Sequence, residues 1–226
     1  MFNFNFINLK LEKNNDRKST MIDKFEITVD VGLGIEAFHS NGFVHRDIKP
    51  ENVLFKEKFS KHTDMISARL ADYGEAYDLN SEEYIYIRDN IDLDEFDCLV
   101  NYDGTIKYAS PEVLQGNLRL LTEKADIYSY GILIWEVFTE RPPFENYTSD
   151  PEFSNDILEE KLTPLYEKDI NGELKKIEYL PGTPKEIDEL VKNCLSWDPK
   201  DRPTIAEVIE EIIRIQKKYG FNNSTR

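Results

Sequence analysis

The chain has 226 residues, of which 40% are hydrophobic and 32% are charged, so it has the composition and length of an ordinary globular protein. Its formal net charge of −16 argues against nucleic acid and anionic membrane surfaces as partners, because both would repel it. Its two cysteines, Cys98 and Cys194, lie too far apart for a disulfide framework or a metal cluster, which favours a reducing, cytoplasmic location.

Two apolar stretches raise the question of a leader or a membrane span. Residues 1–9 lack the basic flank and the small-residue cleavage site of a secretory signal. The longest apolar run, Tyr128 to Phe138, is too short to cross a bilayer and is expected to form a buried helix. We therefore expect no membrane partner.

The first regular element is expected after an irregular lead-in over residues 1–20. Apolar residues then recur close to helical spacing and predict a helix from Met21 to Ser40. They are Ile22, Phe25, Val29, Leu33 and Phe38. Either Ser19 or Thr20 can cap the start of this helix, and Asn41-Gly42 supplies a left-handed stop.

Gly32 and Gly34 weaken the helix prediction, because each costs about 1 kcal/mol relative to alanine inside a helix. Their Gly-x-Gly spacing also occurs in nucleotide-binding loops, but no predicted strand precedes it here. We interpret these glycines as sites of close helix packing.

Short strands, loops and four more helices are expected along the rest of the domain, which should cover residues 21–219 and be followed by a tail. The strands are Asn52–Lys56 and Ser67–Asp72, and the loops are Glu75–Asp103, which is acidic, and Gly104–Glu112. The helices are Glu123–Thr139, Asp150–Lys161, Lys185–Ser196 and Ile205–Tyr219. The predicted fold class is α+β, predominantly α-helical, with a few short strands.

One polar run carries the groups that phosphoryl transfer requires. It reads His45-Arg46-Asp47-Ile48-Lys49-Pro50-Glu51-Asn52. Asp47 can accept the proton of an attacking hydroxyl, and Lys49 brings a positive charge to the same site. Asn52 offers an amide oxygen to Mg²⁺.

This run resembles the catalytic loop of eukaryotic protein kinases, His-Arg-Asp-x-x-x-x-Asn. Farther along, Asp72-Tyr73-Gly74 resembles the family's Asp-Phe-Gly triplet, which implies that Asp72 binds Mg²⁺. Tyr73 stands where the family usually has phenylalanine, and its hydroxyl can bias the loop between active and inactive states. Leu54 matches the residue that lies beneath the adenine ring of ATP.

The end of the activation segment is matched as well. Ala109-Ser110-Pro111-Glu112 resembles the family's Ala-Pro-Glu motif, with one additional residue. Thr105 stands where serine/threonine kinases place a threonine that contacts the catalytic aspartate and lysine, here Asp47 and Lys49. The resemblance therefore implies Ser/Thr rather than Tyr as the phosphate acceptor.

Three further positions carry structural roles that the resemblance implies. Asp126 matches the aspartate that receives backbone N–H groups of the catalytic loop, which begins at His45. Arg202 matches the arginine that forms an ion pair with Glu112. Arg46 matches the arginine that meets a phosphate on the activation segment, although carboxylates of the acidic loop can supply the same charge.

The resemblance implies a kinase large lobe that uses ATP and Mg²⁺ to phosphorylate protein substrates. The residues before Met21 are too few to hold the glycine-rich loop and the lysine strand of a small lobe, so we expect these from a small lobe or regulatory protein in trans, or from a longer gene product. Two alternatives stay open. One is a kinase-like binding module without catalysis, and the other is a regulatory decoy that competes with an intact kinase for substrates.

Overall fold

The computed structural model describes residues 19–59, 64–82, 84–85, 105–116, 121–145, 150–159, 162–168 and 173–221. Most of the predicted lead-in, most of the predicted acidic loop and residues 222–226 lie outside these ranges. The described chain is mostly helical with short antiparallel strands, which confirms the predicted fold class. Among the described residues, no helix is long and apolar enough to cross a bilayer.

Helix α1 (Met21–His39) starts as predicted and ends one residue before the predicted Ser40, and its N-cap is one of the two candidates. The Thr20 side chain accepts a hydrogen bond from the backbone of Asp23, and the Asp23 side chain accepts one from the backbone of Thr20. Gly42 lies just beyond the helix with φ +77°, which is the predicted left-handed stop.

The apolar residues whose spacing predicted α1 are not the ones that make up most of its core. Leu33 is 47% exposed, whereas Ile27, Val31 and Ile35 are fully buried and were not among those residues. The first half of the helix is buried on several sides, because α4, α7 and strand β3 all pack against α1. A stripe drawn for a single buried face therefore misplaces the core.

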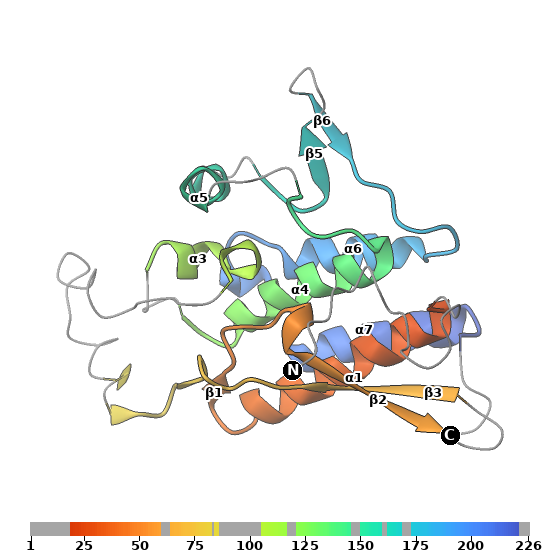
Figure 1. Ribbon diagram of the computed structural model, residues 1–226. Helices are drawn as coiled ribbons and strands as arrows, with labels where there is room; N and C mark the ends of the chain where they lie inside the picture. The colour runs from red at the N-terminus through yellow and green to blue at the C-terminus, as the bar shows by residue number, and fades with distance from the viewer. Residues whose placement is uncertain are drawn as a thin grey trace.

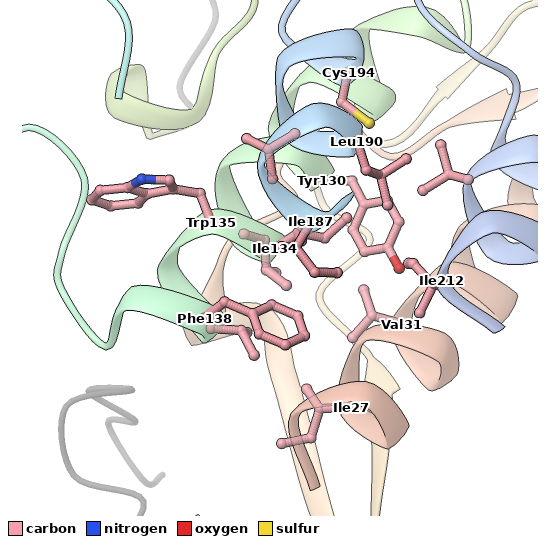
Figure 2. Packing of buried hydrophobic residues seen from close by; sticks show 14 of the residues in the cluster. Ile27, Val31, Tyr130, Ile134, Trp135, Phe138, Ile187, Leu190, Cys194 and Ile212 are labelled. Carbon is pink, nitrogen blue, oxygen red and sulfur yellow. The ribbon is translucent and has the colours of Figure 1, made fainter. Parts of the chain in front are cut away.

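Helix α4 (Lys124–Thr139) is the centre of the molecule. Every residue from Ala125 to Thr139 is buried. Figure 1 shows α4 lying between α6 (Lys185–Cys194) on one side and α1 with α7 (Ile205–Lys218) on the other. Figure 2 shows apolar side chains from these four helices meeting around Tyr130 and Phe138. Burial of such side chains stabilises a fold by about 1.5–3 kcal/mol each.

The glycines in these helices lie at points of close packing, as predicted for Gly32. A Cβ on Gly32 would lie 2.9 Å from both Ile209 Cγ1 and the Tyr130 hydroxyl oxygen. A Cβ on Gly131 of α4 would lie only 2.6 Å from the Cβ of Cys194 in α6. Helices cannot approach this closely with a larger residue at either position.

Strands β2 (Val53–Phe59) and β3 (Asp64–Leu70) form an antiparallel pair that packs on α1. They extend farther toward their connection than the predicted strands, and β3 ends before Asp72. Two smaller pairs were not predicted. Strand β1 (Phe43–Val44) pairs with β4 (Tyr77–Asp78), and β5 (Tyr166–Lys168) pairs with β6 (Leu174–Lys176) in a hairpin that projects from the helices in Figure 1. Runs of two or three residues are too short for a hydrophobic period to reveal.

Five shorter elements complete the described fold. Helix α5 (Asp150–Leu158) begins as predicted and ends earlier, and α3 (Pro111–Leu114) is a short helix where a loop was predicted. A 3₁₀ turn, η4 (Ile106–Tyr108), precedes α3 and packs against α4 and α5. Further 3₁₀ turns lie at Pro50–Asn52 (η2) and Pro199–Asp201 (η6).

Candidate active site

Asp126, in the first turn of α4, positions the start of the catalytic loop. Its Oδ2 accepts the backbone N–H of His45 at 2.8 Å, and its Oδ1 accepts that of Arg46 at 2.9 Å. The Nε2 atom of His39, the last residue of α1, lies 2.9 Å from Oδ2. Asp126 is fully buried, so the loop is bonded to a helix whose residues are almost all buried.

The loop then turns through two residues with distinct environments. Arg46 has φ +67°, an uncommon left-handed conformation for a non-glycine residue, and its guanidinium lies 5.7 Å from the centre of the Tyr77 ring. Burial lowers the pKa of His45. The backbone N–H of Asp47 donates to Nδ1 of His45 at 3.3 Å, which requires that nitrogen to be unprotonated.

Three of the predicted site residues, Lys49, Asn52 and Thr105, surround the carboxylate of Asp47. Asp47 Oδ2 receives Lys49 Nζ at 2.7 Å and Asn52 Nδ2 at 2.8 Å. Asp47 Oδ1 receives only a longer contact among those described, from the backbone N–H of Thr105 at 3.3 Å. Lys49 Nζ also donates to Oγ1 of Thr105 at 2.8 Å. The carboxylate is thus oriented through Oδ2, and Oδ1 is the oxygen better able to take on a new hydrogen bond.

Two oxygen-bearing side chains, which the resemblance implies bind Mg²⁺, lie at the same end of the paired strands. The backbone N–H of Ala71 donates to the Asn52 carbonyl at 2.8 Å, so Asn52 and Asp72 leave the β2–β3 pair at the same end. The Asn52 amide nitrogen bonds Asp47, which leaves its amide oxygen for a metal. Asp72 is exposed, with φ +64°. An amide and a carboxylate oxygen suit Mg²⁺, which keeps water and phosphate as its other ligands.

The ring of Tyr73 contacts two other aromatic rings, one in a tilted and one in an edge-on arrangement. Its ring centre lies 5.0 Å from that of Phe38 and 5.8 Å from that of His45. Its hydroxyl donates to the carbonyl of Leu70 at 2.9 Å. Phenylalanine at this position would make the ring contacts without this hydrogen bond.

An apolar surface borders the site. Leu54 is 51% exposed and Tyr73 is 56% exposed, although large apolar side chains usually lie in the core. Leu54 follows Asn52 closely on β2, and Tyr73 follows the metal-binding candidate Asp72. Exposed large apolar side chains are found at surfaces that bind another group.

Glu112 and Arg202 form the expected buried ion pair. The guanidinium donates to the two carboxylate oxygens at 2.6 and 2.8 Å, and both side chains are almost fully buried. Arg202 also donates to the carbonyl oxygens of Ser196, Lys124 and Trp197. The pair ties the end of the activation segment to the loop between α6 and α7, and loss of one partner would strand a buried charge.

A buried pair behind the activation segment was not predicted from the sequence. The Tyr108 hydroxyl donates to Glu136 Oε2 at 2.6 Å, and Ser129 Oγ donates to the Tyr108 carbonyl at 2.7 Å. Burial raises the pKa of Glu136 to about 7, and Glu51 adds to the increase. The sequence did hold a signal for this pair, because Glu136 lies within an apolar helical run and a buried acid needs a hydrogen-bonding partner. His39 was also not singled out.

Comparison with known proteins identifies the family. A sequence model of the protein kinase domain matches residues 8–212, so the chain belongs to the protein kinase domain family. The match begins before the predicted domain start at residue 21, and that boundary stays a prediction.

Several curated kinases are similar to the chain. The probable serine/threonine-protein kinase gdt2 of Dictyostelium discoideum is 31% identical over 92% of this chain and 11% of its own length. The dual specificity protein kinase shkA of the same organism is 28% identical, over 88% of this chain and 32% of its own. Human receptor-interacting serine/threonine-protein kinase 1 is 30% identical, over 89% and 30%. The chain thus spans about a tenth to a third of the length of these relatives.

Proposed function

We propose that this chain provides the catalytic lobe of a protein kinase that transfers the γ-phosphoryl group of ATP to serine or threonine. The observation that carries the proposal is the set of contacts joining Asp47, Lys49 and Thr105. Through these contacts Thr105, from the activation segment, meets the cation Lys49 and the base Asp47, which precede it by 56 and 58 residues. A scaffold that only binds partners has no need of this arrangement.

Each group has a distinct role in the proposed reaction. The acceptor hydroxyl donates its proton to Asp47, most readily at Oδ1, as its oxygen forms a bond to the γ-phosphorus and the bond from that phosphorus to the bridging oxygen of ADP breaks. Lys49 offsets charge on the moving phosphoryl group. Asn52 and Asp72 would hold Mg²⁺, which neutralises the phosphate oxygens when bound.

Serine or threonine is the proposed acceptor because Thr105 bonds Lys49 and approaches Asp47. The relatives include both serine/threonine and dual specificity kinases. Peptides that differ only in carrying serine, threonine or tyrosine at the acceptor position would decide between these specificities. Comparable turnover of the tyrosine peptide would contradict the narrower proposal.

The phosphates of ATP need a further clamp, which we propose is a small kinase lobe that covers Leu54 and Tyr73. The 226-residue chain alone should therefore turn over below about 0.1 per second, against about 1–100 per second for whole kinases. The test measures transfer from labelled ATP to a generic serine/threonine substrate, with and without a separately expressed small lobe. Turnover that needs both the lobe and Asp47 supports the proposal. Asp47-dependent turnover by the chain alone would contradict the need for a lobe, and a complex that forms without turnover would favour a binding module or a decoy.

A further inference from the structure

Tyr84 lies in the polar segment that follows Asp72-Tyr73-Gly74, and its side chain is nevertheless buried. Its side chain is 3% exposed, and its hydroxyl donates to the carbonyl of Leu121 at 2.6 Å. The Tyr77 ring meets it edge-on, with ring centres 5.7 Å apart. Leu121 belongs to a small apolar cluster with Val44. Tyr84 thus connects the activation segment to the chain just before α4.

The same segment is held at three more places. Strand β4 (Tyr77–Asp78) pairs with β1 immediately before the catalytic loop, and the backbone N–H of Leu79 donates to the Gly42 carbonyl at 2.9 Å. Asn80 fills the space beside Gly42, where a Cβ would lie 1.8 Å from Asn80 Nδ2. These contacts involve few residues, and β4 has only two. Two-residue strand pairs are not stable alone, so they depend on neighbouring side-chain packing.

Docking of this segment bears directly on the site. Strand β1 leads into His45, and Arg46 lies over the ring of Tyr77. At its other end the segment continues from Asp72 and Gly74. A segment that detached at Tyr84 would therefore loosen both the arginine of the catalytic loop and the metal-binding candidate.

We propose that Tyr84 is the anchor that keeps the activation segment docked on the catalytic lobe, and that protein groups alone accomplish this docking. The inference describes regulation of the site and in that sense rests on the proposed function. The Tyr84 hydroxyl is buried and donates a hydrogen bond to the Leu121 carbonyl. A kinase can therefore reach this hydroxyl only after the segment detaches. A phosphate placed there then prevents docking, because about −1.5 to −2 charges cannot return to this apolar site.

Hydrogen exchange of the 226-residue chain tests the anchor. In Tyr84→Phe the ring stays and the hydrogen bond is lost, so the Leu79 amide should exchange about five to ten times faster. In Tyr84→Ala the ring is lost as well, and exchange should be at least about one hundredfold faster. The control is Ile85→Ala, which changes the exposed neighbour and should leave the rate within about twofold.

Two results would overturn the proposal. One is a Leu79 amide in Tyr84→Ala that exchanges as slowly as in the parent chain. The other is a parent chain, purified from its own cells, whose Leu79 amide exchanges faster after phosphatase treatment, since a phosphate would then contribute to docking. Amides of α4 should stay equally protected in all variants, which separates local release from global unfolding. The measurement involves no catalysis, so a chain that fails the kinase assay still tests the anchor.

Discussion

At the scale of single residues, the candidate site depends on buried carboxylates that have different functions. Asp126 is fully buried and accepts hydrogen bonds from two backbone N–H groups of the catalytic loop. Asp47 is 7% exposed, and its partners Lys49 and Asn52 are side chains rather than backbone groups. The first carboxylate stabilises the fold around the loop, and the second is proposed to do chemistry.

Asp126→Ala should therefore destabilise the chain more than Asp47→Ala. Removing Asp126 leaves buried donors unsatisfied at about 1–3 kcal/mol each, so we expect a loss of about 3 kcal/mol or more. In a chain of this size that lowers the melting temperature by about 6–12 °C. Thermal melts of both variants measure the difference, with Asp126→Asn as the control that keeps one acceptor oxygen. An Asp126→Ala chain that melts like the parent would show that the contact contributes nothing.

The raised pKa of Glu136 makes the free energy of unfolding depend on pH. Its pKa in the folded chain is about 7, against an ordinary value of 4.5, because burial disfavours the charged form. Between these two values the folded chain binds more protons than the unfolded chain, so its contribution to stability falls as pH rises from about 4.5 to 7. Above pH 7 the buried, charged Glu136 lowers the free energy of unfolding by about 3 kcal/mol relative to its value at low pH.

The variant Glu136→Gln should remove this part of the pH dependence. Urea unfolding at pH 5 and at pH 8 should give a smaller difference in the free energy of unfolding for the variant than for the parent. Tyr108→Phe is the matched control, because the Tyr108 hydroxyl lowers the pKa of Glu136. Its removal should extend the loss of stability to higher pH. Parent and Glu136→Gln chains with the same difference would contradict the raised pKa.

At the scale of elements, helix packing is set by a few very close contacts. Helices α4 and α6 meet where Gly131 faces Cys194. An alanine at position 131 gains about 1 kcal/mol in helix propensity. Its Cβ would lie 2.6 Å from the Cβ of Cys194, so the two helices must move apart. Cys194 itself is fully buried, which raises the pKa of its thiol to about 12 and makes it an inert packing residue.

Gly131→Ala should lower stability by about 2 kcal/mol, because overpacking exceeds the gain in propensity. A double-mutant cycle with Cys194→Gly identifies the cause. If the two Cβ atoms collide, the double variant should lose at least about 1 kcal/mol less than the sum of the single variants. Chemical unfolding of the four chains supplies the values. Additive losses would mean that the strain arises elsewhere.

At the scale of the whole molecule, the described residues form a helical core, and two exposed apolar side chains neighbour the candidate site in sequence. Leu54 and Tyr73 are exposed beside the polar site, whereas the residues between α1, α4, α6 and α7 are closely packed. The family assignment implies ATP as phosphate donor, and the small lobe proposed above would enclose it against Leu54 and Tyr73. The acidic surface of the chain, with its net charge of −16, would repel free nucleotide unless metal and a clamp are present.

Leu54→Asp tests the proposed contact with a small lobe without disturbing the core. Because half of the side chain is already exposed, stability should change by less than about 0.5 kcal/mol. Activation by an added small lobe should be lost, because a charge would be buried without a partner. Trp197→Ser, which changes an exposed apolar side chain on the loop after α6, should retain activation. Full activation of Leu54→Asp would show that the lobe binds elsewhere or that none is needed.

The sequence predicted the parts of the fold that depend on neighbours along the chain. The start of α1 follows from a capping box that spans three residues, and its end from Gly42. The catalytic loop follows from a motif of eight consecutive residues. Strand lengths and the β1–β4 and β5–β6 pairs were not predicted, because pairing is decided by the partner strand and a two- or three-residue run has no period of its own.

The sequence by itself determined the family, the order of the helices and the identity of the residues proposed for catalysis. Only the tertiary structure decided which buried groups are partners. The contacts of His39 with Asp126, Tyr84 with Leu121 and Tyr108 with Glu136 span 87, 37 and 28 residues. Caps and motifs are fixed by local geometry, which the chain carries in consecutive residues. A buried polar group must be satisfied by whatever the packing of helices brings near it, and that packing is a property of the whole chain.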